Sequence, residues 1–164
     1  MIHKLSLIFC LYLTSFSLVL SAPLDQEAPE CHATNIFNQA KLNISNYQNK
    51  VIYLDFWASW CPPCKKSFPI LNRLHSELKD KGFEVVAINL DENKEEALSF
   101  LQTYPVDFSV FHDAEGVCPD AYEVSAMPSS YIIDKKGLIR KVHLGFHDDS
   151  ENEIRTAILA LLNE

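Results

Sequence analysis

Two cysteines separated by two residues lie where a strand-like segment gives way to a helix-like one. Residues 51–57 (VIYLDFW) form a nearly continuous apolar and β-prone run, which is typical of a strand covered on both faces. Residues 62–81 then repeat apolar side chains at helical spacing, begin with proline and end just before Gly82. Cys61 and Cys64 are therefore predicted to lie at the amino-terminal end of a helix.

That position gives the two cysteines different chemical roles. A helix amino terminus offers free N–H groups and a positive dipole end, so the pKa of a thiol there falls below the free value of about 8.5. Cys61 is the predicted nucleophile. Cys64, one turn later on the same helix face, is predicted to resolve a mixed disulfide formed on Cys61.

Two other readings of the cysteine pair are a zinc half-site and a static disulfide. A tetrahedral zinc site needs four ligands, but neither a second C-x-x-C nor a matching pair of histidines follows in the chain. We therefore favour a redox-active pair. The dithiol–disulfide couple of Cys61 and Cys64 carries the electrons itself, so we expect no metal and no separate cofactor.

The rest of the chain alternates between strand-like and helix-like patterns, which predicts an α/β fold with a central mixed β-sheet flanked by helices. The segments are a strand at 83–90, a helix from Asn93 to about residue 104, a hairpin of 130–133 and 138–144 around the turn 134–137, and a final helix opened by Ser150 with Glu153.

The first 22 residues have the pattern of an export signal. Lys4 is followed by an uncharged run at 5–20 and then by two small residues. The stretch 5–22 is 18 residues long, just enough for an uncleaved membrane anchor. Both readings predict an exported domain, periplasmic or otherwise extracytoplasmic. Residues 23–43 are then a short N-terminal extension, whose polar beginning at 23–30 resembles a tether.

The charge balance narrows the class of partner. Lys and Arg number 14 against 22 Asp and Glu, a formal charge of −8. Nucleic acids and anionic membrane surfaces are bound through clusters of basic side chains, so this acidic balance argues against both. We expect a protein or small-molecule partner and no nucleic acid.

The segment 53–69 (YLDFWASWCPPCKKSFP) resembles the thioredoxin superfamily, and within it the exported TlpA-like and DsbE-like thiol-disulfide oxidoreductases. The resemblance covers about residues 44–162 and implies a thioredoxin-like domain at 44–164. It implies protein dithiols and disulfides as substrates, and a membrane electron donor of the thiol-reducing type. We expect the protein to be a monomer.

A second stretch, 127–134 (MPSSYIID), is similar to the loop of this superfamily that holds a cis-proline, followed by its strand. The resemblance implies that Pro128 is cis and that the backbone of Met127 pairs with an extended substrate segment. It adds Trp60 and Pro62, which flank Cys61, to the substrate-binding residues. The alternative is an ordinary trans proline before a strand.

Asp55 lies six residues before Cys61 within an otherwise apolar strand. A buried carboxyl group has a raised pKa, which suits proton transfer to and from Cys64, and the position matches the buried aspartate of thioredoxin. The alternative is a strand-end residue with access to solvent. Many TlpA-like proteins carry a glutamate three residues after the second cysteine, but Ser67 stands here, so we expect a proton relay through Asp55 alone.

The dipeptide between the cysteines predicts the direction of electron flow. Pro62 and Pro63 have no N–H, so within the motif only the Cys64 amide can donate to the Cys61 sulfur. A modestly stabilised thiolate favours a reducing couple. We expect a protein-disulfide reductase, with cytochrome c maturation as one setting. The alternatives are a disulfide oxidase or isomerase, and a copper-binding module built from Cys61, Cys64 and His143.

Two cysteines remain, and the sequence does not fix their state. Cys118 precedes Pro119 at the start of a predicted short helix, and an inert core thiol is the favoured reading there. An exported chain also permits a structural bridge between Cys31 and Cys118. The third alternative is a regulatory or intermolecular role.

Overall fold

The computed structural model describes residues 24–164. The predicted export signal or anchor at residues 1–22 lies outside the described residues. Between residues 24 and 164, no helix is both long enough and apolar enough to cross a membrane.

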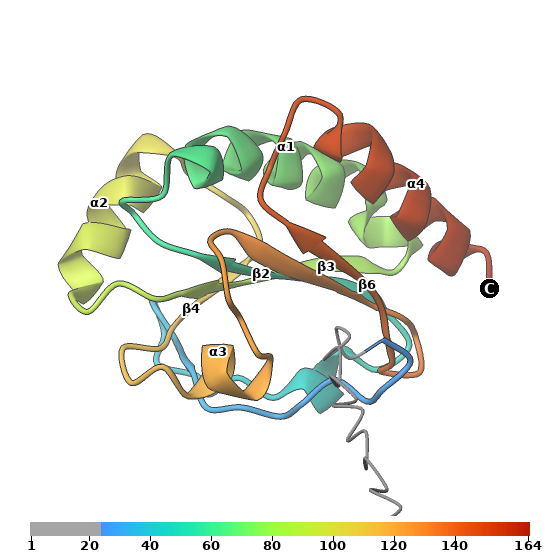
Figure 1. The fold of residues 1–164 in the computed structure, drawn as a ribbon, viewed down its shortest axis with the longest axis horizontal. Helices are drawn as coiled ribbons and strands as arrows, with labels where there is room; N and C mark the ends of the chain where they lie inside the picture. The colour runs from blue at the N-terminus through green and yellow to red at the C-terminus, as the bar shows by residue number, and fades with distance from the viewer. Residues whose placement is uncertain (1–23) are drawn as a thin grey trace, which may run out of the picture.

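A six-stranded mixed sheet forms the centre of the molecule, with strand order β1-β4-β3-β2-β5-β6 (Figure 1). β2 pairs in parallel with β3, and β3 with β4, whereas the other three pairings are antiparallel. The predicted mixed α/β sheet is therefore confirmed. The strands are β1 (Thr34–Asn35), β2 (Val51–Trp57), β3 (Phe83–Asn89), β4 (Ser109–His112), β5 (Ser129–Ile133) and β6 (Ile139–Leu144).

The helices cover both faces of this sheet. In Figure 1, α1, α2 and α4 lie on one side of the sheet and α3 on the other. The buried apolar side chains form two separate clusters. The helices are α1 (Pro62–Leu78), α2 (Lys94–Thr103), α3 (Val117–Ala121) and α4 (Ser150–Leu162), with short 3-10 helices η1 (Ile44–Tyr47) and η2 (Lys79–Lys81).

Strand β2 runs through the middle of the sheet, and all seven of its residues are buried. Because successive side chains of a strand point to opposite faces, Tyr53, Asp55 and Trp57 share one face. Tyr53 and Trp57 belong to the apolar cluster that also contains both Cys61 and Cys64. Asp55 therefore lies on the face that α1 covers, which is where the cysteines are.

The N-terminal extension is bound to the domain, contrary to the expectation of a tether at its beginning. The backbone N–H of Asp25 donates to Ile139 O at 2.7 Å, and Ile139 N–H donates to Gln26 O at 2.9 Å. Ala28 N–H donates to Gly137 O at 2.9 Å. The turn between β5 and β6 and the first residue of β6 supply the partners of these hydrogen bonds, which local composition does not reveal.

One predicted helix start is confirmed and one differs in detail. The Asn93 side chain accepts a hydrogen bond from Glu95 N–H at 3.1 Å and so caps α2. At α4 the N-cap is Asp149, with no side-chain cap bond. The Ser150 hydroxyl instead accepts from His147 N–H at 2.8 Å, so it fixes the preceding loop rather than capping the helix.

Candidate active site

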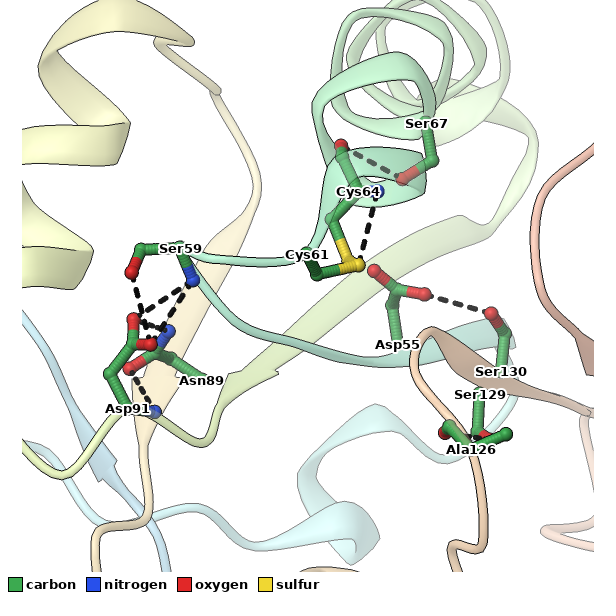
Figure 2. The surroundings of a disulfide bond; sticks show 10 residues. All are labelled: Asp55, Ser59, Cys61, Cys64, Ser67, Asn89, Asp91, Ala126, Ser129 and Ser130. Carbon is green, nitrogen blue, oxygen red and sulfur yellow. Dashed lines mark hydrogen bonds between the residues drawn. A yellow bond between two sulfur atoms is a disulfide. The ribbon is translucent and has the colours of Figure 1, made fainter.

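Cys61 is the N-cap residue of α1, in extended conformation with φ −86° and ψ 108°. Pro62 follows in the first turn, where its missing N–H leaves no helix hydrogen bond unmade. The Cys61 Sγ accepts a hydrogen bond from Cys64 N–H at 3.2 Å, and a disulfide joins the two side chains (Figure 2). The strand–helix junction thus brings the two cysteines together as the sequence predicts.

The disulfide is covered, but its surroundings are not. The exposed fraction is 1% for Cys61 and 0% for Cys64, whereas the neighbouring Trp60 is 63% exposed. Pro62 is also exposed. Trp60 and Pro62, for which the resemblance implies substrate contacts, are thus exposed on either side of the covered Cys61.

Asp55 is buried beneath the disulfide, with only 1% of its surface exposed. Its Oδ1 accepts a hydrogen bond from Ser130 Oγ at 2.8 Å, whereas Oδ2 has no hydrogen-bond partner. Figure 2 shows this second oxygen directed toward the side on which the disulfide lies. Burial raises the pKa of Asp55 to about 7, and the Ser130 hydrogen bond opposes the rise. The alternative of a solvent-exposed strand end is wrong.

Ser130 and Tyr53 belong to this site, although sequence reasoning did not single them out. The Tyr53 hydroxyl donates to Ser130 Oγ at 2.8 Å, and Ser130 donates in turn to Asp55. Asp55 and Ser130 are register partners on β2 and β5. The available signal was a pair of serines at the start of the apolar strand after Pro128, but the partner of Ser130 depends on strand register, which cannot be derived from the sequence.

The loop before β5 contains a cis peptide bond between Met127 and Pro128, as the resemblance implies. Gly145 N–H donates to Pro128 O at 2.8 Å, and the Ser129 hydroxyl donates to Ala126 O at 2.7 Å. Met127 is partly buried and packs against the apolar cluster that contains the cysteines. The loop is thus fixed by hydrogen bonds of the proline and of its neighbours.

A buried carboxylate also holds the loop in front of Cys61. Asp91, 1% exposed at the end of β3, accepts from Ser59 N–H at 3.0 and 3.1 Å and from the Ser59 hydroxyl at 3.1 Å. Asn89 Nδ2 donates to the same carboxylate at 2.8 Å. Figure 2 shows this group beside the chain that leads into Cys61. Sequence reasoning missed Asp91, since a carboxylate after a strand usually lies in solvent.

Cys31 and Cys118 form a second disulfide between residues 87 positions apart in the chain. The favoured reading of Cys118 as an inert core thiol is therefore wrong, and the bridge is present. The exposed fractions are 4% for Cys31 and 0% for Cys118. Both lie in the apolar cluster on the opposite face of the sheet from Cys61 and Cys64. The bridge ties the N-terminal extension to α3.

The histidine of the copper alternative lies elsewhere. His143 is buried on β6, where its Nε2 lies 3.0 Å from Ser150 Oγ. Across residues 24–164, no three His, Cys, Asp or Glu side chains are arranged to hold a metal ion. Cys61, Cys64 and His143 are therefore not brought together.

A family model described as Redoxin matches residues 23–158. The chain belongs to the Redoxin family. Thiol-disulfide oxidoreductase ResA of Bacillus subtilis is 35% identical over 113 residues, covering 69% of this chain and 63% of that protein. ResA of Bacillus cereus is 33% identical over 131 residues, covering 80% of this chain and 75% of that protein. The match to the first of these relatives thus spans less than two thirds of its length.

A solved structure agrees with this Redoxin assignment. A crystal structure from Chlorobium tepidum, provisionally named a thiol:disulfide interchange protein DsbE, has a TM-score of 0.82 and 38% sequence identity. The similarity covers 87% of this chain and 99% of that one. The Redoxin domain described here is therefore a thioredoxin-superfamily domain of the TlpA-like and DsbE-like kind, with the cysteine pair of a thiol-disulfide oxidoreductase.

Proposed function

We propose that this Redoxin protein is an extracytoplasmic protein-disulfide reductase. The observation that carries the direction is the environment of Cys61 Sγ. Among the described residues, one N–H group donates to it, that of Cys64 at 3.2 Å. Pro62 and Pro63 supply no donor, and Met127 packs against the same cluster. A sparsely stabilised thiolate makes the disulfide the favoured product, so the dithiol gives its electrons away.

The reaction proceeds in two exchange steps. The Cys61 thiolate attacks one sulfur of a client disulfide, which forms a mixed disulfide and releases the first client thiolate. Asp55 Oδ2 accepts the proton of the Cys64 thiol, and the Cys64 thiolate then attacks Cys61 Sγ. The second client thiolate leaves and takes up the proton that Asp55 holds. Two electrons pass to the client, and the Cys61–Cys64 disulfide remains.

A second dithiol must return two electrons before the next cycle. We propose a membrane-bound thiol-reducing donor, which exchanges with Cys61 by the same chemistry in reverse. Trp60, Pro62, and the Met127–Pro128 loop form the surface against which either partner docks. This common surface supports sequential contact with donor and client, since one Cys61 serves both.

The second disulfide supports an extracytoplasmic location. Disulfides persist mainly in oxidising compartments, and Cys31 with Cys118 forms one far from the reactive pair. The pattern of residues 1–22 supports export as well. A reductase in an oxidising compartment must act on specific client disulfides. The TlpA-like and DsbE-like resemblance supports cytochrome c maturation as the process in which these clients occur.

Trapping the mixed disulfide tests the roles of the two cysteines. A Cys64→Ser variant, incubated with intact insulin as a model disulfide client, should accumulate a stable mixed disulfide through Cys61. The Cys61→Ser variant is the matched control and should form none. The reduced wild-type protein should reduce the same disulfide and end as the Cys61–Cys64 disulfide. Equal trapping by both variants, or no transfer by the wild type, would contradict the proposal.

A further inference from the structure

A cleft of about 540 Å³ opens between the start of α1 and the length of α2. It adjoins the active-site loop, because Ser59 and Lys65, which flank the Trp60–Cys64 segment in the chain, both line it. Neither the exchange reaction nor the cis-proline loop uses this side of the site. The other lining residues that matter here are Glu95, Glu96, Phe100 and Tyr104, all from α2 and its end.

The wall next to Cys61 is fixed in place. Ser59 is held by both its backbone N–H and its hydroxyl on the buried Asp91 carboxylate. Asp91 lies only three positions before Lys94, the first residue of α2, so the same group ties the Cys61 loop to the beginning of that helix. The mouth of the cleft therefore keeps a constant position relative to Cys61, as a subsite for part of a substrate requires.

One part of the cleft is aromatic. The ring of Phe100 packs 4.7 Å from Trp57 and 5.0 Å from Phe68, centroid to centroid, which anchors it in the core. Tyr104 stacks on Phe100 at 4.8 Å and is only partly buried. Phe100 itself is only 6% exposed, so Tyr104 presents most of the apolar surface that a side chain from another molecule can cover.

Another part of the cleft is acidic. Glu95 and Glu96 are exposed in the first turn of α2, and Lys65 is the single cation that lines the cleft with them. None of the ion pairs among residues 24–164 uses either carboxylate. Two carboxylates facing one ammonium group leave a net negative charge that a basic side chain can complement.

The length of the cleft matches a short extended peptide. Glu95 and Tyr104 are nine residues apart along the chain, which corresponds to about 13 Å at the helical rise of about 1.5 Å per residue. An extended chain covers about 3.3 Å per residue, so about four residues span the cleft.

We propose that this cleft binds the extended client segment adjoining the reactive cysteine, with a Lys or Arg side chain at Glu95 and Glu96 and an apolar one against Phe100 and Tyr104. The inference rests on the proposed function, since it assumes that Cys61 attacks a polypeptide disulfide. It adds the substrate class: unfolded polypeptide with a basic residue close to the cysteine.

Matched peptides test the charge preference directly. Each peptide carries one cysteine as a mixed disulfide with thionitrobenzoate and has Lys, Gln or Glu two residues away. The reduced protein attacks through Cys61 and releases coloured thionitrobenzoate, which gives the second-order rate constant. We expect the Lys peptide to react about threefold to fivefold faster than the Glu peptide, as for an exposed ion pair. The preference should shrink with added salt.

Two double variants assign that preference to the cleft. Glu95→Gln/Glu96→Gln should abolish the difference between the Lys and Glu peptides. Glu115→Gln/Glu123→Gln, which removes two exposed carboxylates near α3 on the other side of the sheet, should retain it. A variant Tyr104→Ala should slow peptides with an apolar residue four positions from the cysteine and leave those with Gly there unchanged.

A small symmetrical disulfide separates this inference from the proposed function. 4,4′-Dithiodipyridine is uncharged at neutral pH and does not extend into the cleft, so all these variants should reduce it at the wild-type rate. Slow reaction of the wild type with this compound would overturn the reductase function itself. If the wild type reacts normally with this compound, either of two results would overturn the cleft proposal alone. These results are equal rates for the Lys and Glu peptides, or a preference that survives Glu95→Gln/Glu96→Gln. The two carboxylates would then only stabilise the helix.

Discussion

Ser130 donates its hydroxyl hydrogen to Asp55 Oδ1 over 2.8 Å, and it leaves Asp55 Oδ2 without a hydrogen-bond partner. The pairing of β2 with β5 sets these two residues opposite each other. The bound oxygen fixes the orientation of the carboxyl group, so the free oxygen faces the disulfide (Figure 2). Because burial raises the pKa of Asp55 to about 7, this group can both accept and return a proton near neutral pH.

Ser130→Ala should move the pH dependence of the reductase reaction upward. The Ser130 hydrogen bond lowers the pKa of Asp55 by stabilising its ionised form, so its loss raises that pKa. A hydrogen bond to a charged group of about 1.5 kcal/mol corresponds to about one pH unit. The measurement is kcat/KM for a protein disulfide against pH. Ser129→Ala, whose hydroxyl donates to Ala126 O instead, is the control and should leave the midpoint unchanged. An unshifted midpoint in Ser130→Ala would count against the relay.

Asp55→Asn should stabilise the oxidised protein at alkaline pH. The pKa of Asp55 is about 7 in the folded state against 3.8 as the ordinary value, so folded protein retains a proton that the unfolded chain has lost between these pH values. The free energy of unfolding therefore falls as pH rises through this window, by about 4 kcal/mol in total. Below pH 3.8 the effect is absent. The variant, which cannot ionise, avoids this loss.

Urea unfolding of oxidised wild type and Asp55→Asn at pH 4 and pH 8 measures that difference. We expect similar stabilities at the acidic pH and a clear advantage of the variant at the alkaline pH. Asp148→Asn, at an exposed loop residue, is the matched control and should behave as the wild type does at both pH values. A constant difference between Asp55→Asn and wild type at both pH values would show that Asp55 does not titrate in this range.

Asp91→Asn should impair the reaction by loosening the Cys61 loop. An amide in place of the carboxylate turns an acceptor into a donor, which faces the donors of Ser59 and Asn89. Because a small displacement of a reacting group lowers the reaction rate steeply, we expect kcat/KM for a protein disulfide to fall about tenfold. Ser59→Ala removes the hydroxyl bond but keeps the N–H bonds, so its effect should be smaller. Wild-type kcat and KM in a folded Asp91→Asn protein would refute this positioning role.

Replacing the second disulfide should cost stability without changing the redox couple. The Cys31–Cys118 bridge closes a loop across 87 positions, and cross-links of that span contribute about 4 kcal/mol. The Cys31→Ala/Cys118→Ala variant should therefore unfold at a lower urea concentration. Its Cys61–Cys64 reduction potential should equal that of the wild type, since the two pairs lie on opposite faces of the sheet. A shifted potential would mean that the bridge is coupled to the active site.

The elements next to the reactive cysteines could be predicted from sequence because their signals are local. An unbroken apolar run specifies β2, and the proline and helical spacing specify the start of α1. β1 and β4 escaped notice because they have two and four residues, too few for a periodic pattern.

The missed parts of the site depend on contacts between distant segments. Ser130 reaches Asp55 from 75 positions away, and Ser59 and Asp91 are 32 positions apart. The Cys31–Cys118 pairing likewise depends on how the N-terminal extension folds back to α3, because cysteine spacing alone does not determine connectivity. Burial of Asp55 was predictable, since the alternation of β2 places it in an apolar layer.

The reduction potential of the Cys61–Cys64 couple tests the central claim of a reductase. The protein is equilibrated with glutathione redox buffers, and its thiols are then alkylated to count the reduced fraction of this pair. A potential near or below about −230 mV is the predicted result, and it means that the dithiol donates electrons to client disulfides. A potential near about −120 mV would contradict the account, because such a couple oxidises dithiols and the two prolines would not set its direction.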